Sequence, residues 1–306
     1  MIRADRITKS FGDAGLDWVP CALCGVIDTR AIYVKFNLVI SRCRQCGLSY
    51  ANPRLQPDDI KTRYSRDYFW NEYLPSTGVR DGRVDFELMD RHHSPMLDVL
   101  RREVPPPAKM LEIGTGAGIF LKVAERAGWS VIGIELSPDA AQFARGLGLD
   151  VRQETAEQMS IEPDSRDVVV MFDTIEHLLD PLSVIRTVHR VLRAGGVLVI
   201  TTPNFNALSR FALGRDWAIL SPAEHLYYFT QRTLRDLLLR VGFSTTRFER
   251  FLAPGAFETM NPANSHHLKS ARNVAYRLFV RLAGPIAFRG VQAVGLADQL
   301  VVVAKK

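Results

Sequence analysis

From about residue 109 onward, short apolar runs alternate with segments of helical periodicity. KMLEI (109–113) and SVIGIEL (130–136) are apolar runs of strand length, and the segments that follow them, 118–128 and 137–148, carry apolar residues at helical spacing. Alternating strands and helices with short turns indicate parallel strands joined by right-handed crossovers. We therefore expect an α/β fold with a doubly wound, Rossmann-like sheet.

The same alternation continues toward the C-terminus. Residues 150–153 form a weak strand candidate, whereas DVVVMFD (167–173) and VLVITT (197–202) are strong ones. Asp180-Pro181 and Ser137-Pro138 are each typical of a capped helix start, and Gly195-Gly196 is a stop signal for a helix ending near 193. A helix over 231–243 and closing strands in TTRFERFL and QLVVVAKK complete a predicted seven-stranded sheet.

The chain divides into three predicted regions. Residues 1–56 form a small module, in which AIYVKFNLVI is typical of a hairpin, and residues 57–105 form a polar helical lid or linker. The run Pro105–Pro107 marks the border with the large domain, residues 106–306. We expect a helical insertion at 253–295 within that domain.

The bulk composition is that of an ordinary globular protein. Of the 306 residues 47% are hydrophobic and 24% are charged, which allows a sizeable core. No run approaches the roughly 18 apolar residues of a membrane span, and the first residues lack the apolar centre of a secretory signal. These features favour a cytoplasmic protein.

All four cysteines lie in two closely spaced pairs. Cys21 and Cys24 form one C-x2-C pair, and Cys43 and Cys46 form the other, with a glycine after each pair. Four thiolates at this spacing are typical of a closed tetrahedral zinc site, which leaves no position for a reacting water and is therefore structural. An iron–sulfur cluster and four reduced thiols are the alternatives.

A glycine-rich turn follows the first strand of the predicted sheet, where Rossmann-like folds bind a nucleotide. The turn contains Gly114, Gly116 and Gly118, and Glu135 ends the next strand, 21 residues after Gly114. A dinucleotide fingerprint would require glycine at position 119, which is isoleucine. S-adenosylmethionine has no pyrophosphate, and its sulfonium and ammonium favour nearby carboxylates such as Glu112, so this spacing favours it over NAD.

From Pro106 to Gly242 the chain resembles the class I S-adenosylmethionine-dependent methyltransferases. The motifs that carry the resemblance are LEIGTGAG, VIGIELSP, QETAEQM, DVVVMFDTIEHLLDP, VLRAGGVLVITTPN and EHLYYFT. The cysteine pairs with the following SYANPR resemble the zinc module in front of certain natural-product sugar C-methyltransferases and related small-molecule enzymes.

The resemblance implies specific cofactor-binding roles. On the methionine and ribose side it implies Glu112, Gly114, Thr115, Gly116 and Gly118. Glu135 would bind the ribose hydroxyls. Leu136, Thr155 and Ala156 would lie near the adenine, and Phe172 and Asp173 would close the site.

The methyl acceptor is expected over the carboxyl ends of the fourth and fifth strands. The candidate residues there are Asp173, Glu176, His177, Asn204, Glu224 and His225. Because the sulfonium already activates the methyl group, the protein mainly supplies alignment, and a hydroxyl or carbon acceptor also needs a base. His177 and His225, with the neighbouring Glu224, are the candidate catalytic residues; turn formation and aromatic packing are their structural alternatives. Tyr64, Tyr68 and Phe69 are candidates for a lid or for interdomain packing.

The net charge of +6 is unevenly distributed. Residues 259–297 hold five basic residues and no acidic one, and the segment 265–290 has a helical apolar stripe beside Arg277 and Arg281. Packing on the domain or on a second subunit explains this pattern, and so does contact with an anionic membrane surface or a lipid-linked substrate. The sequence leaves the oligomeric state open.

The leading hypothesis is methyl transfer to a small molecule, such as a sugar, a lipid-linked glycan or a natural-product intermediate. A zinc-module RNA methyltransferase is an alternative, although residues 1–57 contain eight basic and four acidic residues, a modest excess of +4 that disfavours nucleic acid. A non-catalytic binding protein on this scaffold is a third hypothesis, and a dehydrogenase is disfavoured by Ile119.

Overall fold

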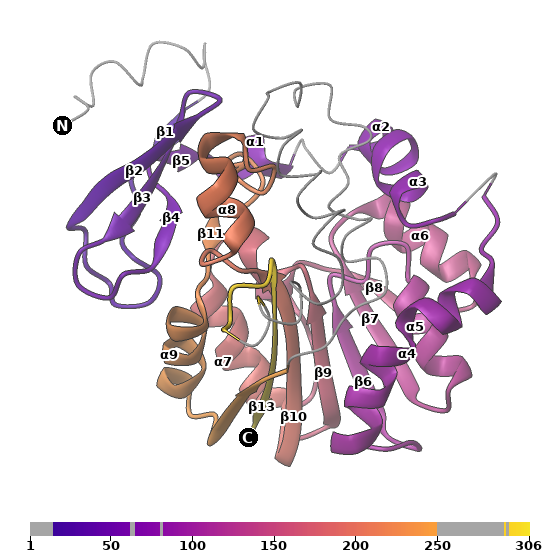
Figure 1. The fold of residues 1–306 in the computed structure, drawn as a ribbon. Helices are drawn as coiled ribbons and strands as arrows, with labels where there is room; N and C mark the ends of the chain where they lie inside the picture. Colours follow the sequence, from indigo (N-terminus) through magenta and orange to yellow (C-terminus); the bar gives the residue numbers. More distant parts are fainter. Residues whose placement is uncertain (1–14, 62–64, 80–81, 250–290, 292–293) are drawn as a thin grey trace.

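The computed structural model describes residues 15–61, 65–79, 82–249, 291 and 294–306 (Figure 1). Its centre is a seven-stranded sheet in the order β12-β13-β10-β9-β6-β7-β8. Five strands are parallel: β6 (Lys109–Ile113), β7 (Ser130–Glu135), β8 (Val151–Gln153), β9 (Arg166–Phe172) and β10 (Leu192–Pro203). β13 (Gln299–Lys305) and β12 (Thr245–Phe248) close the sheet in antiparallel register. The predicted sheet is confirmed.

Helices cover both faces of this sheet. Alternate residues of each strand face opposite sides, as Leu111 and Met110 of β6 do. One face packs against α7 (Pro181–Val191) and α9 (Gln231–Val241), and the other against α4 (Phe86–Glu103) and α5 (Ile119–Arg126). α6 (Pro138–Gly146) packs beside α5 at the β7–β8 end.

The helix starts follow from side-chain caps. Ser137 and Asp180 each accept a hydrogen bond from the backbone N–H three residues later, and Thr230 forms a reciprocal capping box with Thr233. The first two caps were predicted, but the predicted end of the helix after Asp180 was too late. α7 ends at Val191, and Gly195, with a positive φ of 75°, belongs to an irregular start of β10.

The N-terminal module is a small sheet whose last strand belongs to the large domain. β2 (Thr29–Lys35) and β3 (Leu38–Cys43) form the predicted hairpin, and β3 pairs with β4 (Ser49–Ala51). β4 in turn pairs with β11 (Tyr227–Tyr228). The short strands β1 (Leu16–Asp17) and β5 (Arg54–Leu55) form a separate pair. Figure 1 shows the module beside α8 (Leu208–Leu213) and β11.

Between the module and α4 the chain forms short helical turns. These are α1 (Pro57–Lys61), α2 (Arg66–Tyr68), a π-helical turn η4 (Phe69–Tyr73) and α3 (Leu74–Ser76). The described part of the large domain contains the 3-10 turns η5 (Ala156–Gln158), η6 (Ile175–His177) and η7 (Gly214–Asp216). The described part of residues 57–105 is therefore largely helical, and its role as a lid stays a prediction.

The predicted helical insertion at 253–295, with the basic segment 265–290, lies outside the described residues apart from 291, 294 and 295. Among the helices that the structure does describe, none combines the length and the hydrophobicity needed to cross a bilayer.

Gly118 offers a test of how α5 packs on α6. Its φ is +72°, and an added Cβ would lie 2.7 Å from the Cβ of Ala144 and 2.8 Å from Cδ1 of Leu149. We predict that Gly118→Ala lowers the free energy of unfolding by about 2–4 kcal/mol, because it combines left-handed strain with overpacking. Urea unfolding measures the change.

Gly146→Ala is the matched control. This glycine lies within α6, has no positive φ, and has open space around the added Cβ. Alanine should stabilise the protein there by about 0.5–1 kcal/mol. Equal effects of the two substitutions would contradict the packing described for Gly118.

Candidate functional site

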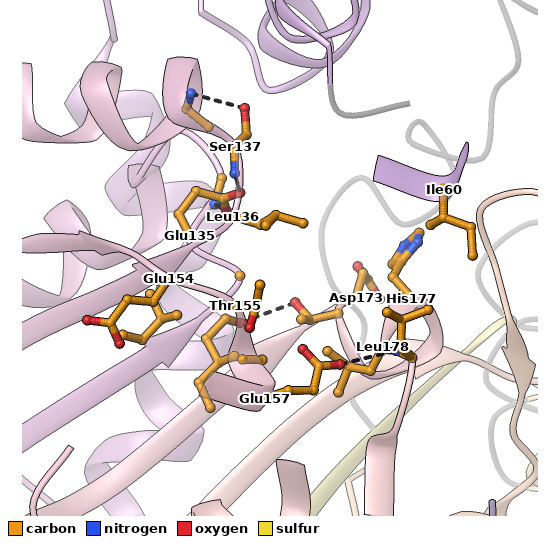
Figure 2. A pocket seen from close by; sticks show the side chains of 18 of the residues that line it. Ile60, Glu135, Leu136, Ser137, Glu154, Thr155, Glu157, Asp173, His177 and Leu178 are labelled. Carbon is orange, nitrogen blue, oxygen red and sulfur yellow. Dashed lines mark hydrogen bonds between the residues drawn. The ribbon is translucent and has the colours of Figure 1, made fainter. Parts of the chain in front are cut away.

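A cavity of about 380 Å³ opens at the carboxyl ends of β6, β7 and β9. β6 lies between β7 and β9, so the chain order reverses here, and diverging loops leave a crevice at such a point in an open α/β sheet. Figure 2 shows Glu135, Leu136 and Ser137 on one side of the cavity and Asp173, His177 and Leu178 on the other, with Ile60 of α1 near His177.

The glycine turn brings bare backbone to the wall of this cavity. Gly114 and Gly116 line it, with φ values of +76° and +52°. A Cβ on Gly116 would lie 1.8 Å from the hydroxyl of Tyr73, and one on Gly114 would lie 2.5 Å from Oγ1 of Thr174. Both positions therefore require glycine for conformation and for space.

Glu135 ends β7 with its carboxylate held by backbone. Oε2 accepts a hydrogen bond from the N–H of Gly116 at 2.7 Å, and Oε1 accepts one from the N–H of Ser137 at 2.8 Å. Burial raises the pKa of Glu135 in spite of these two donors. Each oxygen keeps a second lone pair, which suits a carboxylate that receives two ribose hydroxyls.

Glu112 lies on β6 behind the glycine turn, only 3% exposed. Its Oε2 has no hydrogen-bond partner in the described part of the chain. Burial, together with the charge of Glu135, raises the pKa of Glu112 well above its ordinary value. A buried carboxyl without a partner is costly unless a cation lies near it.

The other residues that the resemblance assigns to the cofactor differ in whether they line the cavity. Leu136, Thr155, Ala156, Phe172 and Asp173 line the cavity, and their contacts with a cofactor stay a prediction. Glu112 and Thr115 are buried behind its wall. Gly118 was also expected to line it, but its Cα faces Ala144 and Leu149, so that glycine serves the packing of α5 on α6.

Aromatic side chains from the helical turns cover the glycine loop. Tyr68, Phe69 and Tyr73 line the cavity, and the rings of Phe69 and Tyr73 stack with centroids 5.9 Å apart. The lid prediction for Tyr68 and Phe69 agrees with this placement, whereas Tyr64 lies outside the described residues. Sequence reasoning missed Tyr73; the aromatic run YFWNEY was its available signal.

His177 and His225, which are distant in sequence, lie together with ring centroids 4.8 Å apart. Nδ1 of His177 is 2.9 Å from the carbonyl oxygen of Glu224, and Nδ1 of His225 is 2.8 Å from that of Ile219. A carbonyl oxygen can only accept, so each Nδ1 carries the proton and each Nε2 presents a lone pair. Glu224 thus contributes its main chain to the orientation of His177.

Enclosure by protein limits the basicity of these imidazoles. Burial and the neighbouring His225 lower the pKa of His177 to about 3. Burial also lowers the pKa of His225, although the charges of Glu224 and Asp173 oppose the shift. The charges of Glu224 and Asp173 thus favour a proton on His225, whereas it is His177 that lines the cavity.

Glu176 completes this cluster. Its Oε2 accepts from the hydroxyl of Thr202 at 2.9 Å, whereas Oε1 has no partner among the described residues. Ligand atoms of Glu176, His177 and His225 all lie within 4.8 Å of one another, close enough to hold a metal ion. Sequence reasoning placed Glu176 near the acceptor but did not identify this grouping.

Two further acceptor-side candidates differ in their surroundings. The carboxylate of Asp173 faces the cavity and accepts hydrogen bonds from Gln299 and Thr201. Asn204 is buried, and its amide donates to the carbonyl oxygens of Gly295 and Ala297. Asn204 therefore anchors the chain before β13 and does not reach an acceptor.

The four cysteine sulfurs gather at one end of the N-terminal module. Sγ atoms of Cys21 and Cys46 are 3.4 Å apart, those of Cys24 and Cys43 are 3.5 Å apart, and all four lie within 4.8 Å. A tetrahedral ion with bonds of about 2.3 Å separates its sulfurs by about 3.8 Å. None of the four cysteines forms a disulfide, so all four sulfurs are available as ligands. Their spacing is close to that of a tetrahedral zinc site.

Comparison with known proteins identifies the family. A methyltransferase-domain family matches residues 88–247, which is more than half of the chain, and the chain belongs to this family of class I S-adenosylmethionine-dependent methyltransferases. Two solved structures share the fold at low identity. A SAM-dependent methyltransferase from Archaeoglobus fulgidus has a TM-score of 0.53 and 20% identity over 77% of this chain and 100% of that one. The phosphoethanolamine N-methyltransferase 2 of Haemonchus contortus has a TM-score of 0.52 and 19% identity over 79% and 59%.

Curated relatives match part of the chain. A ubiquinone biosynthesis O-methyltransferase of Pseudomonas aeruginosa is 41% identical over 105 residues, which cover 32% of this chain and 45% of that protein. The protein of the same name from Cereibacter sphaeroides is 31% identical over 147 residues, covering 44% and 59%. The chain thus spans about half the length of the curated relatives that it matches.

The two buried carboxyls predict how binding of a cationic ligand depends on pH. A sulfonium stabilises the ionised forms of Glu112 and Glu135, so binding lowers their raised pKa values and releases protons. Affinity for S-adenosylmethionine should therefore rise as the pH increases above 4.5, the ordinary pKa of a glutamic acid. Calorimetry in buffers of different ionisation enthalpy measures the proton release.

Glu135→Gln removes one titrating group and should reduce the number of protons released. Proton uptake on binding, or an affinity that falls over this pH range, would contradict the assigned positions of the two carboxyls.

Proposed function

We propose that this protein transfers the methyl group of S-adenosylmethionine to a hydroxyl group of a small molecule. The observation that carries the proposal is one cavity with two different walls. The glycine turn and Glu135 form a nucleoside-binding wall, and Asp173 and His177 form a polar wall opposite it. Methyl transfer requires such an arrangement, because the acceptor oxygen must approach the methyl carbon from the side opposite the sulfur that leaves it.

The cofactor roles follow from the placement of the residues. Glu135 would accept hydrogen bonds from both ribose hydroxyls. Leu136, Thr155 and Ala156 would enclose the adenine. Backbone of Gly114 and Gly116 would contact the methionine moiety, with Glu112 behind it supplying negative charge. These roles are consistent with membership of the family and with the cavity lining.

The acceptor side favours oxygen chemistry. A hydroxyl loses its proton as the methyl group arrives, and the lone pair on Nε2 of His225 lies in a cluster beside His177, which lines the cavity. The partial matches to proteins named O-methyltransferases support a hydroxyl acceptor. Sugars, lipid-linked glycans and phenolic or other natural-product intermediates form the panel to screen.

Titration calorimetry tests the cofactor half of the proposal. We expect S-adenosylmethionine to bind with a Kd in the micromolar range, and Glu135→Gln to weaken it by on the order of 10–100-fold through loss of charge-assisted hydrogen bonds. Glu154→Gln is a matched control, because Glu154 also lines the cavity but its carboxylate accepts a hydrogen bond from the N–H of Ser160 and not from the glycine turn.

NADH serves as the negative control in the same experiment. Binding of NADH in preference to S-adenosylmethionine, or equal binding of the cofactor by wild type and Glu135→Gln, would contradict the proposal.

A divalent cation on the acceptor side is an alternative to a histidine base, because an Nε2 atom that binds a metal ion cannot also accept a proton. Three observations favour it: the unpartnered Oε1 of Glu176, the two oriented Nε2 atoms, and the closeness of all three ligand atoms. When bound, such an ion would supply Lewis acidity to an acceptor oxygen.

Manganese tests this site separately from the cysteines, because Mn²⁺ prefers oxygen and imidazole ligands to thiolates. We predict that electron paramagnetic resonance of the zinc-loaded protein detects about one bound Mn²⁺ per chain, and that Glu176→Gln weakens binding by about tenfold or more. Glu224→Gln is the control, since the main chain of Glu224 orients His177. Equal Mn²⁺ binding by wild type and Glu176→Gln would exclude this cation site.

A further inference from the structure

One segment of the large domain orients both imidazoles of the acceptor side. We call residues 217–228 the histidine segment. The carbonyl oxygen of Ile219 fixes Nδ1 of His225, and that of Glu224 fixes Nδ1 of His177. The direction in which each Nε2 points therefore depends on the backbone position of this segment.

The N-terminal module holds the first end of the histidine segment. Nζ of Lys35, at the end of β2, donates to the carbonyl oxygen of Trp217 at 2.9 Å. Burial lowers the pKa of Lys35, while Asp216 opposes the shift. Trp217 is 2% exposed and packs in one cluster with Ile40 of β3 and Tyr33 of β2. A lysine placed here fixes a main-chain carbonyl, so it fixes the start of the segment.

The module also holds the second end, through the main chain of Leu226 and through the pairing of β4 with β11. The N–H of Ala51 in the module donates to the carbonyl oxygen of Leu226 at 2.8 Å. The N–H of Leu226 donates in turn to the carbonyl oxygen of Glu176, also at 2.8 Å. The main chain of Leu226 thus joins the module to the turn that carries Glu176 and His177.

The cysteine cluster lies close to this second connection. β3 ends at Cys43 and β4 begins shortly after Cys46, so the cluster fixes the turn between the two strands. Nη2 of Arg232 in α9 donates to the carbonyl oxygen of Cys46 at 2.6 Å. Cys21, Cys43, Leu226 and Tyr227 share one hydrophobic core. Order at the cysteines is thereby transmitted to β4 and to β11.

We propose that the zinc module is a positioning element of the acceptor site: by holding both ends of the histidine segment, it sets the orientation of His177 and His225. Lys35 and Ala51 are its positioning residues, and neither touches the cavity. The proposal rests on the assignment of the acceptor side above, but it concerns the tautomers of the imidazoles and the order of the segment, which are measurable without turnover.

The test compares Lys35→Met with wild type in the zinc-loaded full chain. Methionine keeps the length of the side chain and removes the donor. Nuclear magnetic resonance with ¹⁵N-labelled histidine reports which ring nitrogen carries the proton. We expect wild type to show the Nδ1–H tautomer for His177 and His225, and Lys35→Met to shift His225 to a mixture with the Nε2–H form. Amide exchange in residues 217–228 should rise by about tenfold.

Lys122→Met is the matched control, because Lys122 is a lysine of α5 that pairs with Glu125 away from the module. It should leave the tautomers and the exchange unchanged. The Kd for S-adenosylmethionine should stay within about twofold in both variants, because the glycine turn and Glu135 lie on the other wall. Unchanged histidine tautomers and exchange in Lys35→Met would overturn the proposal.

Removal of zinc by a chelator provides a second, independent test of the proposal. We expect faster exchange at Leu226 and Ala51 while β6 and β9 stay protected. Unchanged exchange at Leu226 would overturn the proposal, and so would equal loss of protection in β6 and β9, since the module would then serve only global stability. If wild type fails to bind S-adenosylmethionine, the proposed function fails, whereas the tautomer and exchange measurements still decide this proposal.

Discussion

The reversal of chain order between β6 and β9 determines where this protein can bind a ligand. Chains that leave the two strands turn toward opposite faces of the sheet, so no crossover fills the space above their carboxyl ends. The glycine turn enters that space from β6, Glu135 reaches it from β7, and Asp173 reaches it from β9. The regular packing of helices on both faces keeps these three strand ends at fixed positions. The aromatic turns near Tyr73 and the turn that carries His177 lie at the same edge of the sheet.

Buried carboxyl groups without full sets of hydrogen bonds distinguish this edge from the rest of the core. Glu112 on β6 and Glu176 in η6 are both buried, and each has one oxygen without a partner in the described structure. A buried charge without a partner lowers the free energy of unfolding by several kcal/mol. Such carboxyl groups therefore stay protonated unless a positively charged group binds beside them. A sulfonium beside Glu112 and a cation beside Glu176 would meet this requirement in the same way. Burial is the main cause of the raised pKa of both groups, and the negative charges of Glu135 beside Glu112 and of Asp173 beside Glu176 add to it.

Sequence reasoning predicted the parts of this architecture that are local. Strand and helix periodicity, the caps at Ser137 and Asp180, and the spacing of the cysteines each depend on neighbouring residues, and the structure contains them. The parts it missed depend on contacts between distant segments. β11 has two residues, too few to show a periodicity, so its pairing with β4 left no signal. The grouping of Glu176 with His225 required the same tertiary information. Gly118 was assigned to the cofactor because a motif does not separate a glycine that faces a ligand from one that faces a helix.

We propose that the crevice between β6 and β9 holds the cofactor with its sulfur facing the histidines. A crystal structure of the protein with S-adenosylhomocysteine tests this placement directly. We predict that both ribose hydroxyls contact the carboxylate of Glu135, that the adenine lies between Leu136 and Ala156, and that the sulfur faces Asp173 and His177. A ligand bound elsewhere, or one whose ribose lies away from Glu135, would contradict it.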